Sequence, residues 1–249
     1  MRDLHVHTTF SDGRNTPEEM VMAAIAKGMD TIGFSDHSYT AFDTAYCIPK
    51  EQIPAYRAEI AALKEKYAGQ IRILCGIEQD FYSEEPTDGY DYVIGSVHYV
   101  KAGDEYFPID ESKERLLDGV RLYFSGDIYA LIEAYYETVS QVAERIRPNI
   151  IGHFDLITKF NETGELFDDM HPRYIAAWQR AADKLLEANI PFEINTGAIS
   201  RGYRTAPYPA TPIREYLAAQ GAKFLLSSDS HRADTLCFGF AAYVNEQTP

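Results

Sequence analysis

Residues Tyr92–His98 read Tyr-Val-Ile-Gly-Ser-Val-His, an apolar run that ends in a histidine. Short apolar runs of this kind are typical of parallel strands that are covered on both faces. The segments Ile71–Glu78 and Ile150–His153 repeat the pattern, and each ends in a side chain able to bind a metal ion. The pattern indicates a sheet of buried strands with polar residues at the strand ends.

Seven strands of this type are expected along the chain. They are Asp3–His7, Thr31–Ser35, Ile71–Glu78, Tyr92–His98, Ile150–His153, Phe192–Asn195 and Lys223–Ser228. Helical patterns lie between several of them, over residues 16–28, Lys50–Tyr67, Ile128–Ile146, Pro172–Ala188 and Pro212–Gln220. This alternation of strands and helices predicts parallel β/α units.

The strand ends decide between an open sheet and a barrel, because periodicity alone allows both. In a barrel, the carboxyl ends of all strands converge on one rim, where the catalytic residues of that fold lie. In an open sheet, the same polar residues would be spread along a line, too far apart to share one site. We therefore predict a closed or nearly closed barrel of β/α units, similar to a TIM barrel, formed by residues 1–249 as a single α/β domain.

Nine candidate metal ligands lie at or just beyond these strand ends. They are His5, His7, Asp12, His37, Glu78, His98, His153, Asp229 and His231. His5 and His7 should point to the same side because successive strand side chains alternate faces. Asp229 and His231 repeat this two-residue step if strand geometry persists. His171 stands outside the pattern, at a helix start, where a capping or surface role is expected.

The number of candidates predicts more than one ion. A zinc-like ion takes three or four protein ligands, so nine candidates indicate two or three divalent ions with a bridging carboxylate. Imidazole combined with carboxylate favours zinc, iron or manganese over calcium or magnesium. No cysteine lies among the candidates, which argues against a purely structural thiolate site.

Six short motifs follow one another along the chain. They are His5-x-His7 with Ser11-Asp12-Gly13, Ser35-Asp36-His37, Gly76-x-Glu78, Gly95-Ser96-Val97-His98, Gly152-His153-x-Asp155 and Ser228-Asp229-Ser230-His231. In this order, over residues 5–231, they resemble the PHP (polymerase and histidinol phosphatase) family. The resemblance implies a distorted seven-stranded β/α barrel with a trinuclear metal centre on its rim.

The resemblance also divides the candidate ligands into three sets. The first ion would be held by His5, His7, Glu78 and Asp229, and the second by Glu78, His98 and His153. The third would be held by Asp12, His37 and His231. Glu78 would then bridge the first two ions.

Family membership would imply hydrolysis of a phosphomonoester. Two ions bridged by Glu78 would activate a shared water as a hydroxide nucleophile, and a third would help to hold the phosphate oxygens. Asp155 or His231 could assist the leaving alkoxide. The strand end Glu193–Thr196 and the loop after it are most similar to stand-alone histidinol-phosphate phosphatases. Those enzymes convert L-histidinol phosphate and water to L-histidinol and phosphate, in histidine biosynthesis.

Cationic side chains after the strand ends are candidates for binding the phosphate. Lys159 follows the fifth expected strand, and Arg201 and Arg204 follow the sixth. A planar guanidinium suits phosphate through paired hydrogen bonds, and Arg201 is the preferred ligand. The segments Tyr39–Ile48 and Tyr99–Phe124 are expected to form lids that shape specificity.

Composition disfavours nucleic acid and membranes as partners and does not forbid the small phosphorylated substrate that the resemblance implies. A net charge of −15 disfavours binding to a nucleic-acid backbone. The chain has no run of eighteen apolar residues, so no membrane span is expected. Three cysteines and the absence of a signal-peptide pattern predict a cytoplasmic protein with reduced thiols. Nothing in the pattern predicts an oligomeric state.

Three other functions fit parts of the pattern. The chain could be a PHP-type phosphatase that acts on another phosphoester, such as phosphotyrosine. A 3′-exonuclease activity, as attached to some polymerases of the family, is disfavoured by the charge and by the lack of a polymerase domain. A non-catalytic metal-binding module should have lost ligands, whereas this chain keeps nine candidates.

Overall fold

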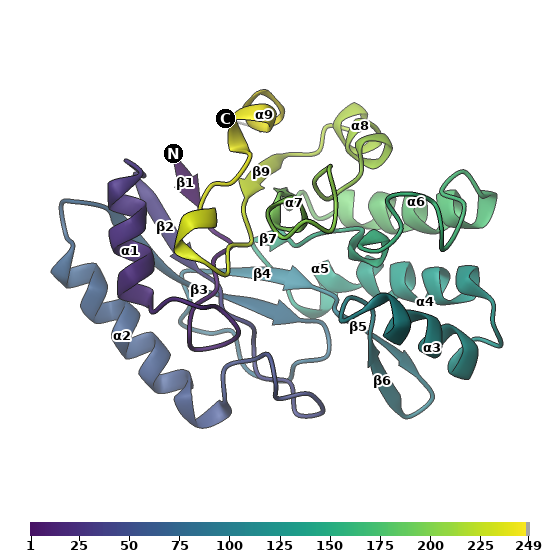
Figure 1. Ribbon diagram of the computed structural model, residues 1–249, viewed down its shortest axis with the longest axis horizontal. Helices are drawn as coiled ribbons and strands as arrows, with labels where there is room; N and C mark the ends of the chain where they lie inside the picture. Colours follow the sequence, from purple (N-terminus) through teal and green to yellow (C-terminus); the bar gives the residue numbers. More distant parts are fainter. Residues whose placement is uncertain (248–249) are drawn as a thin grey trace.

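Seven strands form one parallel sheet in the computed structural model, which describes residues 1–247 (Figure 1). They pair in the order β1-β2-β3-β4-β7-β8-β9. Their bounds are β1 Arg2–Asp3, β2 Thr31–Phe34, β3 Arg72–Asp80, β4 Tyr92–Ser96, β7 Ile150–Ile151, β8 Phe192–Asn195 and β9 Phe224–Ser227. Six of the seven begin and end within two residues of the predicted strands, β1 overlaps its predicted strand only at Asp3, and the predicted parallel sheet is confirmed.

The sheet closes on itself through the segments that follow β1 and β9. Val6 and Ser230 form a parallel bridge. The amide of His7 donates to the carbonyl of Ser230 at 2.9 Å, and the amide of Ser230 donates to the carbonyl of His5 at 3.1 Å. The result is a nearly closed barrel of seven parallel strands, as predicted, and the open sheet is excluded.

Helices fill the connections between the strands. The longer ones are α1 Pro17–Ala26, α2 Ile53–Lys66, α3 Lys113–Tyr123, α4 Ile128–Ser140, α6 Pro172–Leu186 and α8 Thr211–Ala219, and the short ones are α5 Val142–Arg145, α7 Gly197–Ser200 and α9 Phe240–Tyr243. Thr16 and Glu19 close the start of α1 in a reciprocal capping box. His171 caps α6 by accepting from the amide of Arg173 at 3.2 Å, which is the role expected for it.

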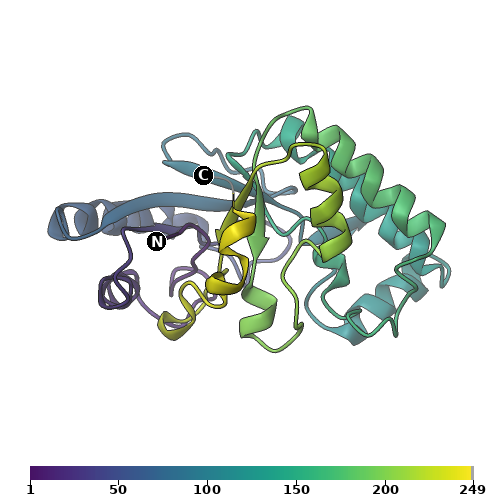
Figure 2. The same cartoon turned by 90° about the horizontal axis from the view of Figure 1, so that it is seen from above.

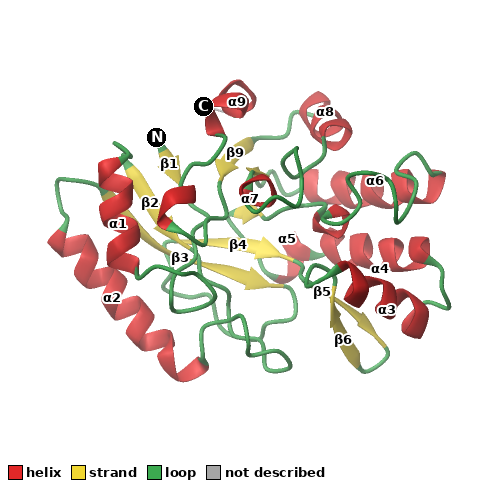
Figure 3. Cartoon of the chain, viewed as in Figure 1, coloured by secondary structure: helices red, strands yellow, loops and turns green. Residues whose placement is uncertain are grey.

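Two groups of helices cover the outside of the barrel. Helices α1 and α2 lie beside β1–β3, and α4 and α6 pack against each other on the opposite side (Figures 2 and 3). The first group buries an apolar cluster around Met20, Ile32 and Tyr56. The second buries a larger cluster that includes Trp178 and Phe192. Burial of such side chains contributes about 1.5–3 kcal/mol each, so most of the fold's stability lies in these two layers.

Tyr92 fills the amino-terminal end of the barrel. Its hydroxyl lies 2.6 Å from the carbonyl oxygen of Leu4 and 3.0 Å from that of Phe34. The ring fits only because Gly33 and Gly76 face it: a Cβ atom on either would lie within 2.5 Å of the Tyr92 side chain. Tyr92 therefore occupies the space between these strands at the end of the barrel opposite the rim.

The first predicted strand, Asp3–His7, is longer than the observed one. Regular pairing with β2 ends at Asp3, because the following residues leave that ladder and hydrogen-bond to Ser230 to close the barrel. The predicted helix Ile128–Ile146 is also divided at Gln141, whose amide bonds to Thr138 three residues back and tightens the turn.

The predicted lid Tyr99–Phe124 has regular structure of its own. It forms an antiparallel hairpin of β5 (Tyr99–Ala102) and β6 (Glu105–Pro108), followed by α3. Gly103, with a φ of +64°, supplies the tight turn between the two strands. Among residues 1–247, no helix combines the length and the apolar character that crossing a membrane requires.

Asp3 holds the seam between the first and the last strand. Its side chain is fully buried, and its carboxylate accepts from the amides of Ser228 at 3.1 Å and Cys237 at 2.9 Å. The hydroxyl of Ser228 also donates to it. Residues far apart in the sequence are thus joined through one carboxylate directly below the rim.

We expect Asp3→Ala to lower the free energy of unfolding by about 3 kcal/mol, since it leaves buried N–H and O–H donors without an acceptor. Urea-induced unfolding of the chelator-treated protein measures this without a contribution from metal binding. Asp30→Ala is the matched control, because the Asp30 side chain is 80% exposed and pairs with the amino terminus at the surface. A loss in Asp3→Ala no larger than in the control would contradict this role.

Candidate metal centre

The carboxylate of Glu78 lies at the middle of the rim, near the end of β3, and is surrounded by five histidines. The distances from Oε2 are 2.8 Å to His37 Nδ1, 3.3 Å to His5 Nε2 and 3.6 Å to His7 Nε2, and those from Oε1 are 2.9 Å to His153 Nε2 and 3.3 Å to His98 Nε2. Burial alone would raise the pKa of Glu78, but the surrounding histidines hold it well below its usual range. Glu78 is therefore ionised.

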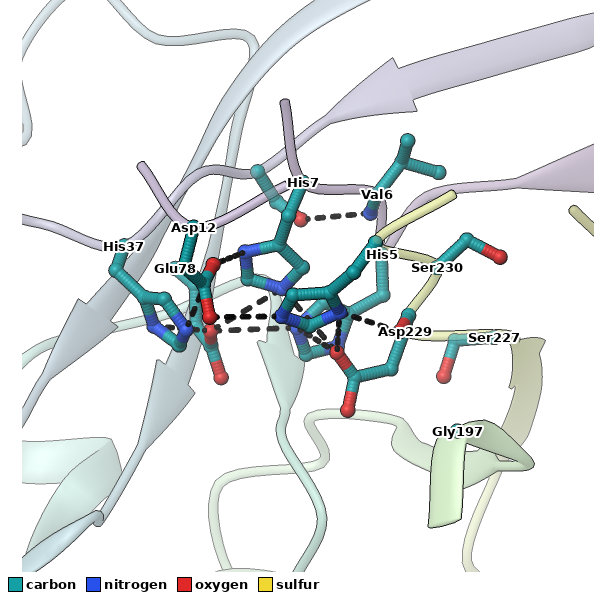
Figure 4. Close-up of polar contacts among 12 residues, drawn as sticks. His5, Val6, His7, Asp12, His37, Glu78, Gly197, Ser227, Asp229 and Ser230 are labelled. Atoms are coloured by element: carbon teal, nitrogen blue, oxygen red, sulfur yellow. Dashed lines mark hydrogen bonds and ion pairs between the residues drawn. The ribbon is translucent and has the colours of Figure 1, made fainter. Parts of the chain in front are cut away.

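The structure brings all nine predicted ligands together. The side chains of His5, His7, Asp12, His37, Glu78 and Asp229 point toward one another in Figure 4. All nine form four overlapping groups, in each of which the ligand atoms lie within 4.8 Å of one another. The groups are His7-Asp12-His37-His231, His5-His7-Asp229, His5-Glu78-His153 and His37-Glu78-His98. His37 thus lies close to Glu78 as well as to Asp12, whereas the three predicted sets place it with Asp12 and His231 only.

The donor atoms have the properties of a metal site. Among the described residues, Nε2 of His5, both ring nitrogens of His7 and Oε2 of Glu78 are buried without a hydrogen-bond partner. Each such atom costs about 1–3 kcal/mol unless it is satisfied. Burial, together with the neighbouring His231 and His37, lowers the pKa of His7 to about 3, so its imidazole is neutral, the form that binds metal. The residues fit divalent ions of the zinc, iron or manganese type.

Two carboxylates behind the candidate ligands orient them. Glu193 Oε2 lies 2.8 Å from Nδ1 of His5, and Asp80 Oδ2 lies 3.2 Å from Nδ1 of His98. Such contacts fix the imidazole tautomer and direct the other nitrogen toward the ion. Sequence reasoning did not identify these two roles. The two-residue spacing of Asp80 from Glu78 on β3 was a signal, because it places both on one face of the strand.

Asp229 reaches the cluster from an irregular backbone. Strand β9 ends at Ser227, and Asp229 has a φ of +49°, in the left-handed region. The strand geometry assumed for Asp229 and His231 therefore does not persist. Both still reach the cluster: Asp229 Oδ1 lies 3.2 Å from His7 Nε2, and His231 Nε2 lies 3.1 Å from Asp12 Oδ2.

The cluster opens into a cavity of about 280 Å³. Six candidate ligands line it, together with Asp80, residues of the predicted lids and two cations. The lid residues include Tyr46, Tyr99, Asp110 and Glu111, and the cations are Lys159 and Arg201. The predicted lids therefore do border the site.

The four remaining predicted residues differ in their positions. Lys159 lines the cavity and donates to the carbonyl of Asp110 at 2.7 Å. Arg201 lines it and contacts Asp229 at 2.9 Å. Arg204 lies outside the cavity lining, is 7% exposed and donates to Thr158. Asp155 is also outside the lining, fully buried, and accepts from the amide of Ala210 at 2.9 Å.

A family model described as the PHP domain matches residues 3–197. The chain belongs to the PHP family. A Deinococcus radiodurans protein named "Probable histidinol-phosphatase" is 31% identical over 255 residues, which cover 98% of this chain and 91% of that protein. The resemblance drawn from the ordered motifs is confirmed.

Two solved structures share the fold. A crystal structure of a Listeria monocytogenes protein has a TM-score of 0.84 at 23% identity and covers 98% of this chain and 100% of that one. The histidinol phosphate phosphatase of Lactococcus lactis, solved with zinc, L-histidinol and phosphate, has a TM-score of 0.63 at 22% identity and covers 93% and 86%. This PHP chain is accordingly a metal-dependent phosphoesterase of the family that includes histidinol-phosphatases.

We expect Glu78→Gln to lose at least one bound ion per chain and at least 100-fold in kcat, because an amide cannot bridge two cations as a carboxylate does. Elemental analysis after dialysis against buffered zinc measures the ions, and phosphate release measures kcat. Glu65→Gln, an exposed change on α2, is the control. If the metal content of Glu78→Gln equals that of the parent protein, Glu78 is not a metal ligand.

Proposed function

We propose that this PHP phosphoesterase hydrolyses phosphomonoesters and that its substrate is L-histidinol phosphate. The observation that carries the proposal is a nine-residue His/Asp/Glu cluster at the floor of a cavity whose outer wall is acidic. The curated relatives named as histidinol-phosphatases support it, including the Deinococcus radiodurans protein.

The centre would hold two or three ions. In the division that the family resemblance implies, His5, His7 and Asp229 would bind the first, His98 and His153 the second, and Asp12, His37 and His231 the third, with Glu78 shared by the first two. The observed groups around Glu78 instead place His153 with His5 and His98 with His37. When bound, these ions supply Lewis acidity toward phosphate oxygens and toward a water molecule. Glu193 and Asp80 keep His5 and His98 aimed at the centre.

Of the two residues expected to assist the leaving oxygen, His231 is the one that faces the cavity, where it would serve as a metal ligand and not as the proton donor. Its side chain is 20% exposed, lines the cavity and stacks on His7 with ring centroids 4.1 Å apart. The Asp155 carboxylate is fully buried and bound to the amide of Ala210. Asp155 would instead hold together the segments that follow β7 and β8.

Lys159 would contact the phosphate of the substrate. Its ammonium lies 4.8 Å from the centre of the Tyr203 ring and 5.5 Å from that of Phe160, which limits its movement at the cavity wall. It pairs with the carboxylate of Asp110 at 3.2 Å, so the anionic phosphate would compete for a cation already fixed in place.

The acidic outer wall suits the ammonium group of histidinol phosphate. Asp110 and Glu111 line the same cavity as the cluster and follow β6. Lys159 holds the pKa of Asp110 below its usual range, although burial opposes this, so Asp110 is ionised. Because Asp110 already pairs with Lys159, Glu111 is the carboxylate that we propose for the ammonium of the substrate. Phosphotyrosine in an acidic peptide would meet repulsion from this wall.

Phosphate release from a panel of esters tests the substrate. We expect kcat/KM for L-histidinol phosphate to exceed that for phosphotyrosine and p-nitrophenyl phosphate by about 100-fold or more, equivalent to about 2.7 kcal/mol of transition-state binding. A higher value for phosphotyrosine would favour the alternative phosphatase. No turnover of any ester by zinc- or manganese-loaded protein would favour a non-catalytic module.

We expect Glu111→Gln to raise KM for L-histidinol phosphate about fivefold, since a part-exposed ion pair contributes about 1 kcal/mol, and to leave KM for p-nitrophenyl phosphate unchanged. The second substrate has no ammonium group. Glu114→Gln, an exposed change in the first turn of α3, is the control. An equal rise for both esters would assign Glu111 no part in recognising the ammonium.

A further inference from the structure

Arg201 makes its contacts with candidate metal ligands. Its Nη2 donates to Oδ2 of Asp229 at 2.9 Å, and its Nη1 donates to the carbonyl oxygen of Asp229 at 2.9 Å. Nη1 also lies 3.0 Å from Nδ1 of His231. The guanidinium therefore holds the side chain and the backbone of Asp229, and it is linked to His231 through the Asp229 carbonyl that both residues contact.

With these contacts made, Oδ1 of Asp229 and Nε2 of His231 remain free to face the candidate metal ligands. With Oδ2 of Asp229 on Arg201, Oδ1 lies 3.2 Å from Nε2 of His7 and 3.7 Å from Nε2 of His5. The carbonyl of Asp229 also lies 2.9 Å from Nδ1 of His231 and can accept its proton. That tautomer directs the lone pair of Nε2 toward Asp12, 3.1 Å away.

The contacts of Arg201 also fix the backbone at Asp229. The left-handed region is uncommon outside glycine, although aspartate enters it more readily than most residues. The Asp229 φ of +49° lies in this region. A guanidinium that binds both the carbonyl and the carboxylate enforces it directly.

Gly197 allows the close approach. It begins α7, the helix that ends just before Arg201, and it lies beside Asp229 (Figure 4). A Cβ atom on Gly197 would lie 2.7 Å from Cβ of Asp229 and 2.9 Å from Nη2 of Arg201. Any side chain there would push the guanidinium and the carboxylate away from their present positions.

Lys159, the other cation of the cavity, is bonded differently. It donates to Asp110, which is not among the candidate ligands, and the hydrogen bonds of the described residues give it no contact with the cluster. The two cations therefore have different hydrogen-bond partners. Lys159 binds an acidic residue of the cavity wall, whereas Arg201 binds the segment that carries Asp229 and His231.

We propose that Arg201 is a positioning residue of the metal centre, which fixes Asp229 and His231 for metal binding, with Gly197 providing the space it needs. The proposal rests on the proposed function only in that these two residues bind metal. It changes the role expected for Arg201, from a ligand of the substrate phosphate to a support for metal ligands.

The test measures metal affinity and needs no substrate. The chelator-treated full-length protein is titrated with Zn²⁺ alone against a competing indicator. We expect Arg201→Lys and Arg201→Met to weaken binding of at least one ion by about 10–100-fold, since an ammonium cannot hold a carboxylate and a carbonyl in the guanidinium's forked geometry. Lys159→Met is the matched control and should leave the Zn²⁺ affinity within twofold of the parent.

Gly197→Ala changes no charge and should weaken Zn²⁺ binding in the same direction. Circular dichroism of each metal-free variant checks folding, and Arg201→Lys keeps the test valid if Arg201→Met does not fold. A Zn²⁺ affinity in Arg201→Lys and Gly197→Ala within twofold of the parent would overturn the proposal. Weaker inhibition of Arg201→Lys by inorganic phosphate with unchanged Zn²⁺ affinity would return Arg201 to the role of a phosphate ligand.

The outcomes separate this proposal from the substrate assignment. If L-histidinol phosphate is not the substrate, the Zn²⁺ titration still reports on Arg201. If Zn²⁺ binds the parent with the expected stoichiometry and the variants bind equally well, only the positioning role fails.

Discussion

One buried carboxylate organises the structure. Glu78 is 1% exposed and lies against five imidazoles, an arrangement that would be too costly without the compensating charge of cations or protonated histidines. The five histidines come from segments spread between residues 5 and 153, so each segment must end at one height on the barrel. The hydrogen bonds of Tyr92 at the opposite end of the barrel and those of Asp3 at the seam between β1 and β9 hold the strands in this arrangement.

The strands and most of the candidate ligands could be predicted because the end of each strand fixes where the next residue lies in a barrel. The apolar runs located the strands, and in a closed barrel the residue after each run must reach the same rim. Glu78, His98 and His153 each stand at or just past such an end, which is why the structure places them together. The motif order then identified the family without any knowledge of distances.

The rest depended on contacts that no local pattern reports. The orienting carboxylate of Glu193 meets His5 across 188 residues of sequence, so only the folded barrel shows their pairing. The left-handed backbone of Asp229 could not be read from a segment that continues a strand-like run. Arg201 fits either phosphate or a carboxylate by its chemistry, and only the positions of neighbouring atoms distinguish the two.

The seam between the first and last strands also bears on the order in which the chain matures. Asp3 and Ser228 meet although they are 225 residues apart in the sequence. During synthesis, His5 and His7 are made well before Asp229. Contacts of such long separation form late, since most of the loop entropy must be lost first. The first ion that we propose for these three residues would therefore bind only to a chain in which β9 has been made and has docked beside β1.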